Sequence, residues 1–96
     1  MLASVKLITQ RMGKRQFMVE LHKKPFSTWF DPAKVADRIE GWGTLYGVER
    51  VRIGQGKEFA RLYVTTTDLN LDARMLKRSV DAECEMLENE AKQNEK

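Results

Sequence analysis

The chain has 96 residues, 42% of them hydrophobic, which is enough for one domain with a single core but too few for a deep, enclosed substrate cavity as well. No apolar run approaches the ~20 residues of a transmembrane helix, and the single cysteine, Cys84, excludes an internal disulfide, so we expect a cytoplasmic protein with no membrane contact. Residues 1–78 contain 15 basic and 8 acidic side chains, whereas residues 79–96 contain 2 and 6. A basic body of this kind favours a polyanionic partner.

The chain opens with a predicted β-hairpin, whose strands are residues 4–9 and 17–21. Apolar residues alternate with polar ones in the second strand, as in a sheet with one buried face. If residues 12–14 form the loop, Thr9 lies opposite Phe17 and the large side chains of both strands share one face.

Three aromatic residues lie in the connecting segment 26–30, FSTWF. Large aromatic side chains in so small a domain favour burial, so we expect this segment to cover the core. The alternative is a partner contact that includes Trp29 and Phe30.

A helix is predicted from Asp31–Pro32 to Gly47, because aspartate caps free backbone amides and proline loses nothing at a first helical position. The glycines at 41 and 43 weaken this helix, which can bend or stop there. Gly47 is suited to end it in a left-handed conformation. Its apolar stripe comprises Val35, Ile39, Trp42 and either Leu45 or Tyr46.

Residues 48–53 and 59–66 form a second predicted hairpin. A two-residue turn at Gln55–Gly56 would place Arg50 directly opposite Arg61, and Arg52 opposite Phe59. Like charges that face each other destabilise a sheet, so this register predicts a need for an external anion.

The last helix is predicted to begin near Asp68 or Asn70 and to end at about Ala91. Its apolar stripe is longer than a four-stranded sheet covers, so we expect its end to project or to meet another chain. Basic residues lie near its start and acidic residues near its end, which predicts an antiparallel homodimer of this helix. The residues assigned to a dimer or partner interface are Leu76, Val80, Leu87, Ala91, Trp29 and Phe30.

The elements together predict an α+β domain of order ββαββα, with a four-stranded antiparallel sheet and two helices on one of its faces. Residues 1–92 form the domain, and residues 93–96 are expected to fray. The second face of the sheet is then left open.

Catalytic and metal sites are not expected. His22 is the only histidine and Cys84 the only thiol, so one chain can assemble neither a Cys–His nucleophile pair nor a Cys/His zinc site. We therefore expect a non-enzymatic protein without metal or cofactor.

The open face is the candidate site, because arginines and aromatic rings interleave on the second hairpin. Proteins bind single-stranded nucleic acid with this combination of side chains: cations contact the phosphates and flat rings stack on the bases. Two alternatives are that Glu20 or Glu49 neutralises the arginines, or that the rings cover an oligomer contact. The candidate nucleic-acid-binding residues are Arg50, Arg52, Arg61, Phe59, Tyr63 and Lys6.

The predicted function is that of a small binding protein whose basic, aromatic sheet face contacts nucleic acid or a nucleoprotein. The alternative is a protein–protein effector, an inhibitor or adaptor of a host complex of the kind that phages and mobile elements encode. Such an effector would use the same basic face or the FSTWF segment.

Overall fold

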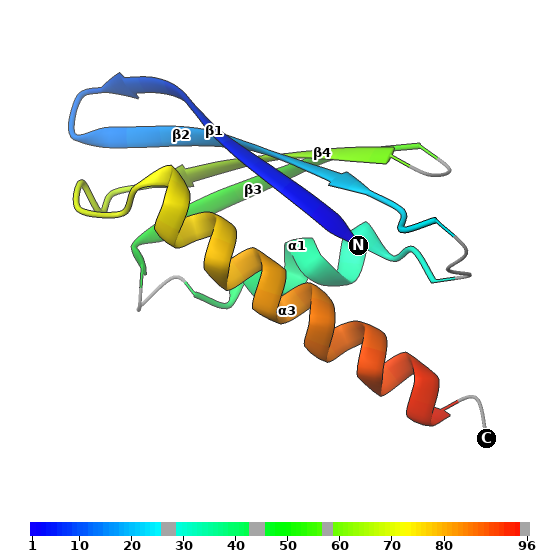
Figure 1. The fold of residues 1–96 in the computed structure, drawn as a ribbon. Coiled ribbons are helices and arrows are strands. Elements are labelled where there is room, and N and C mark those ends of the chain that lie inside the picture. Colours follow the sequence, from blue (N-terminus) through cyan, green and yellow to red (C-terminus); the bar gives the residue numbers. More distant parts are fainter. Residues whose placement is uncertain (26–28, 43–45, 57–58, 95–96) are drawn as a thin grey trace.

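The computed structural model describes residues 1–25, 29–42, 46–56 and 59–94 (Figure 1). The element order is ββαββα, which confirms the predicted α+β class. The elements are β1 (Leu2–Arg11), β2 (Lys14–His22), α1 (Pro32–Glu40), β3 (Val48–Gln55), β4 (Phe59–Thr66) and α3 (Ala73–Asn94).

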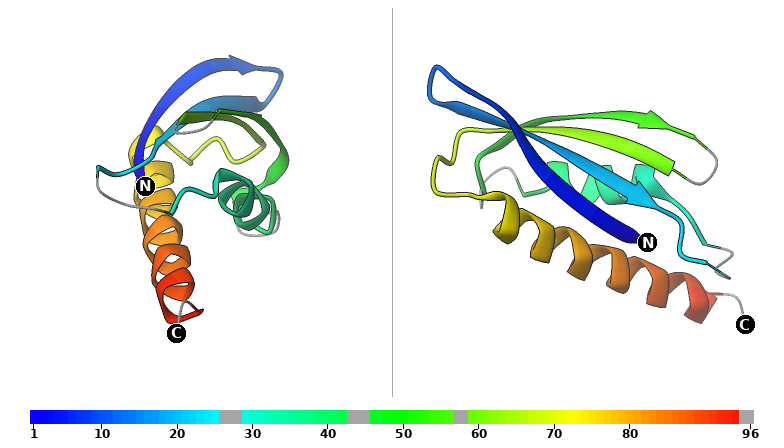
Figure 2. Two further views of the ribbon diagram at one scale, coloured as in Figure 1. Left: turned by 90° about the vertical axis from the view of Figure 1, so that its right-hand side faces the viewer. Right: turned by 45° about the horizontal axis from the view of Figure 1, so that its top comes forward.

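The four strands form one antiparallel sheet of order β1-β2-β4-β3, and both helices lie on the same face of it (Figure 2). Helix α1 packs beneath β3, and α3 crosses beneath β1. The last turns of α3 extend past the sheet (Figure 1). No helix of the described residues is long and apolar enough to cross a membrane.

The register of the first hairpin differs from the prediction by two residues. Leu7, not Thr9, pairs with Phe17, and the turn consists of Met12 and Gly13 alone. Both turn residues have positive φ, 53° and 75°, which matches the twist of the strands in a two-residue hairpin turn. A bulge between Leu7 and Thr9 takes up the remaining residue.

The register of the second hairpin differs from the prediction by four residues. Arg61 pairs with Gly54, not with Arg50, and Gln55 belongs to β3, where it pairs with Ala60. The turn therefore lies beyond Gln55, and part of it lies outside the described residues. A shift by an even number of residues leaves the arginines on their predicted face, because side chains alternate with a period of two. Val48 is an exception: it was predicted on the face of Arg50, but a bulge between the two residues turns it into the core, where it is 8% exposed.

Helix α1 begins as predicted: Asp31 Oδ1 accepts a hydrogen bond from Lys34 N at 3.3 Å, and Pro32 is the first helical residue. It ends at Glu40, because Gly41 follows as its C-terminal cap. Gly47 has the predicted left-handed conformation, with φ of 63°, but it leads into β3 instead of ending α1.

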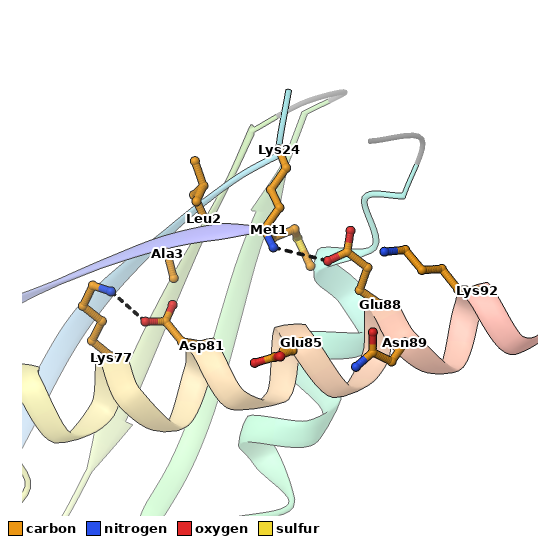
Figure 3. Close-up of a pocket in the computed structure, with 10 residues that line it drawn as sticks. All are labelled: Met1, Leu2, Ala3, Lys24, Lys77, Asp81, Glu85, Glu88, Asn89 and Lys92. Carbon is orange, nitrogen blue, oxygen red and sulfur yellow. Dashed lines mark hydrogen bonds and ion pairs between the residues drawn. The ribbon is translucent and has the colours of Figure 1, made fainter. Parts of the chain in front are cut away.

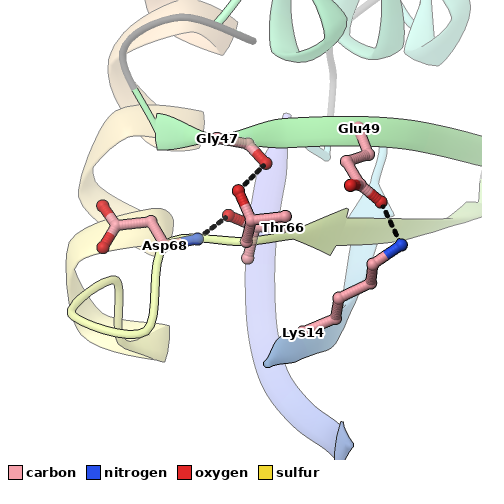
Figure 4. Close-up of polar contacts among 6 residues, drawn as sticks. Lys14, Gly47, Glu49, Thr66 and Asp68 are labelled. Carbon is pink, nitrogen blue, oxygen red and sulfur yellow. Dashed lines mark hydrogen bonds and ion pairs between the residues drawn. The ribbon is translucent and has the colours of Figure 1, made fainter. Parts of the chain in front are cut away.

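Helix α3 begins later than predicted. Asp72 caps it, accepting a hydrogen bond from Met75 N at 2.8 Å, whereas Asp68 accepts one from Asn70 N within the preceding turn. Thr66 Oγ1 supports this turn by accepting from Asp68 N at 3.1 Å (Figure 4). The helix continues to Asn94, past the predicted end of the ordered domain at residue 92.

The core lies between the sheet and the two helices. Helix α3 contributes Leu76, Val80 and Leu87 to this core, and their exposed fractions are 0%, 0% and 4%. These three residues are therefore already covered within one chain, which corrects their assignment to an interface. Ala91 is partly exposed, and Trp29 and Phe30 pack partly buried against the core, while Phe26 lies outside the described residues. The fully buried residues from the sheet include Phe17, Val19, Leu21, Leu62 and Val64.

Candidate functional site

The site is the sheet face opposite the helices, here called the open face. The strand registers arrange its side chains in rows across the sheet. The rows are Leu2–His22–Phe59, Ser4–Glu20–Arg61–Gly54, Lys6–Met18–Tyr63–Arg52 and Thr9–Gln16–Thr65–Arg50. All six candidate nucleic-acid-binding residues lie on this face.

The arginines are spread over the open face rather than crowded together. Arg50 lies opposite Thr65, and Arg52 lies opposite Tyr63. Arg61 faces Gly54 on one side and Glu20 on the other. The predicted like-charge pair is therefore wrong, because the hairpin register separates its two members. The repulsion that it implied is not an argument for an external anion.

Within the part of the chain that the structure describes, the arginines nevertheless have no carboxylate partner. Arg50, Arg52 and Arg61 are exposed, and none forms an ion pair with another described residue. Glu20 instead approaches His22, with 3.9 Å between Oε2 and Nε2, and Glu49 pairs with Lys14 at 2.9 Å (Figure 4). Neither carboxylate named in the alternative interpretation pairs with an arginine of this face.

The aromatic side chains lie beside these cations. Phe59 contacts the His22 ring, with 4.7 Å between centroids, and the Arg61 guanidinium lies 5.3 Å from the centre of the Phe59 ring. Tyr63 lies between Met18 and Arg52 and is partly exposed. The face therefore has an aromatic end around Phe59 and a basic region around Arg52.

Three further residues of this face, His22, Arg11 and Lys14, are not among the predicted binding residues. His22 was predicted only as a surface residue of a strand, and its ring in fact lies against the Phe59 ring in a tilted arrangement. Arg11 and Lys14 lie opposite each other in the strand register beside the Met12–Gly13 turn, and they extend the face at the hairpin end. A two-residue turn, which the glycine favours, would have placed both on this face.

Another hollow lies between the start of β1 and α3, with a volume of about 450 Å³ (Figure 3). Four of its charged side chains form two ion pairs: Lys77 pairs with Asp81 at 2.6 Å and Lys24 with Glu88 at 3.5 Å. Among the described residues, no group of three or more His, Cys, Asp or Glu side chains is placed to hold a metal ion.

Cys84 and His22 do not form a catalytic pair. Cys84 is 1% exposed in the core, and His22 lies on the open face, on the other side of the sheet. Burial raises the pKa of the Cys84 thiol from 9.0 to about 11, which keeps it in the poorly nucleophilic thiol form.

Comparison with known proteins found no family model, no curated protein and no solved structure that matches this chain.

Proposed function

We propose that this domain binds single-stranded nucleic acid, free or within a nucleoprotein, on the open face of its sheet. The observation that carries the proposal is the placement of four basic side chains around two partly exposed rings on one uncovered sheet face. The basic residues are Lys6, Arg50, Arg52 and Arg61, and the rings are those of Tyr63 and Phe59.

Single strands suit this face better than a duplex. The rings of Tyr63 and Phe59 can stack only on bases whose faces are free, and a duplex hides those faces within its own stack. The cations around the rings offer partners to phosphate oxygens, and arginine does so with a rigid, bidentate fork. Aromatic rings and cations on one open sheet are a recurrent solution to this recognition problem.

Fluorescence anisotropy with labelled single-stranded DNA, single-stranded RNA and duplex DNA, each over a series of salt concentrations, tests the proposal. We expect both single strands to bind more tightly than the duplex, with an affinity that falls steeply as salt rises. Arg50→Ala and Arg52→Ala should each make the salt slope shallower by ~0.7.

The matched control is Arg78→Ala, which removes the same charge from the exposed side of α3. It should leave affinity and slope close to the wild-type values. Lack of single-strand binding by the wild-type protein at low salt would rule the proposal out.

The effector alternative is favoured by a separate feature, the apolar residues of the β1 edge. Leu7, Ile8 and Met12 are 40%, 42% and 94% exposed, and β1 is an edge strand with an unpaired side. Exposed edges of this kind add a strand from another protein. Ile8→Thr together with Met12→Ser should abolish binding to such a partner and leave the open face unchanged.

A further inference from the structure

A shallow hollow of about 220 Å³ lies at the hairpin end of the open face. Most of its lining comes from rows already described: Thr9, Gln16 and Thr65 form one row, and Arg11 and Lys14 form the next. Arg15 completes the lining. The hollow therefore lies in line with the cations of the open face and beside Arg50, which pairs with Thr65.

The chemistry of the lining is that of a phosphate site. Two hydroxyl groups and one amide can donate hydrogen bonds, and two guanidinium groups and an ammonium supply positive charge. One of these guanidinium groups, that of Arg15, already donates from Nη1 to Leu71 O at 2.9 Å. No Asp or Glu is among the described residues that line it. A neutral polar ligand would not need three cations, and an apolar ligand would leave these donors without acceptors.

We infer that this hollow holds one phosphate group of the strand bound on the open face, an assignment that rests on the proposed function. Arg11 is the principal contact, because it forms no ion pair with another described residue, whereas Lys14 is held by Glu49 at 2.9 Å. That surface pair is half-exposed on both sides and therefore weak, so Lys14 can also turn toward the phosphate.

The position of the hollow sets the length of the bound segment. Thr65 borders the hollow and Phe59 marks the aromatic end, six residues apart on β4, which is roughly 20 Å at ~3.3 Å per residue. Stacked nucleotides advance ~3.4 Å each, so the face accommodates up to about six nucleotides. One end of this segment has its phosphate in the hollow, and the other has its base against Phe59.

The test uses the whole chain and a single-stranded thymidine oligonucleotide of about six nucleotides. Arg11→Ala is expected to weaken binding several-fold and to make the salt slope shallower by ~0.7, and Thr65→Val is expected to weaken it without changing the slope. Glu49→Gln, which frees Lys14, is expected to tighten binding. Arg78→Ala is again the charge-matched control, and thermal unfolding verifies that each variant is folded.

A second arm uses inorganic phosphate alone, followed by the amide NMR signals of Thr9, Gln16 and Thr65. These signals are expected to shift in the wild-type protein and not in Arg11→Ala. If the oligonucleotide binds and Arg11→Ala behaves like Arg78→Ala, the phosphate site is wrong while the proposed function stands. If the oligonucleotide does not bind, the proposed function fails, and phosphate-induced shifts at these amides alone decide whether the hollow is an anion site.

Discussion

Arg61 of β4 lies directly opposite Glu20 of β2, yet the two side chains form no ion pair, and the Arg61 guanidinium lies over the Phe59 ring instead. Glu20 is thus a carboxylate in the middle of a face that carries Lys6, Arg50, Arg52 and Arg61. Its field opposes the approach of a polyanion without cancelling any single arginine through direct contact.

Replacing this carboxylate is therefore expected to strengthen nucleic-acid binding. Glu20→Gln keeps the size of the side chain and removes one negative charge, so affinity for single-stranded DNA should rise two- to five-fold, on the order of 0.5–1 kcal/mol at low salt. Anisotropy titrations at two salt concentrations measure the effect, and the gain should shrink at the higher one. Glu40→Gln, on the exposed side of α1, is the control; an equal gain in both variants would mean that only net charge matters.

Tyr63 is expected to contribute through stacking rather than through charge. Tyr63→Leu keeps an apolar side chain but removes the flat ring, and binding should weaken by ~1–3 kcal/mol while the salt slope stays as in the wild type. Titrations over a salt series separate this effect from that of Arg52→Ala, which should change the slope. Wild-type affinity in Tyr63→Leu would show that no base stacks there.

Gly47 is expected to be important for stability, because it combines a positive φ of 63° with a crowded site. A Cβ at this position would lie 2.5 Å from Thr67 Oγ1 and 3.1 Å from Asp68 N. Gly47→Ala should therefore lower the free energy of unfolding by ~1–3 kcal/mol, as measured by urea denaturation. Gly54→Ala is the control, since a Cβ there meets nothing within 4 Å, and equal losses in both would contradict this explanation.

Because Cys84 is buried, we expect the protein to lose stability at alkaline pH. Its pKa is 9.0 in the unfolded chain and about 11 in the folded one, because burial penalises the thiolate. Above pH 9 the unfolded state loses the proton first, so this contribution to stability is fully present below pH 9. It falls as pH rises toward 11, by up to ~1.4 kcal/mol per pH unit.

The comparison for this prediction is Cys84→Ala. Urea denaturation at pH 8 and pH 10 should show a smaller loss of stability in the variant than in the wild-type protein. Parallel losses would assign the pH dependence to other groups.

Periodicity predicted the elements well where one face of each is buried. The alternation of Phe17, Val19 and Leu21 and the stripe of Val35 and Ile39 are local patterns, and the structure buries all five side chains as expected. The open face was predictable for the same reason, since residues that alternate with buried ones must lie on the other side of the strand.

Registers and helix starts were less predictable. The pairing of Arg61 with Gly54 depends on how Val51 and Ile53 fit against β4 and on a loop whose length local patterns do not determine. Asp68, Asn70 and Asp72 are all competent helix caps, and only the path from β4 to the core selects Asp72. The surplus apolar stripe of α3 was assigned to a partner because the extent of the sheet above it was unknown.

By itself, the sequence determined the order of the elements and the basic, aromatic character of the uncovered face, since these follow from periodicities of 2 and 3.6 residues. It also determined the face of the strand side chains away from the two bulges, which moved Thr9 to the open face and Val48 to the core. Only the tertiary structure decided which side chains become neighbours. Cross-strand register and packing between layers depend on contacts between residues far apart in the chain, and these separated Arg50 from Arg61, placed Arg11 and Lys14 beside Thr65, and buried Leu76 and Val80 in the chain's own core.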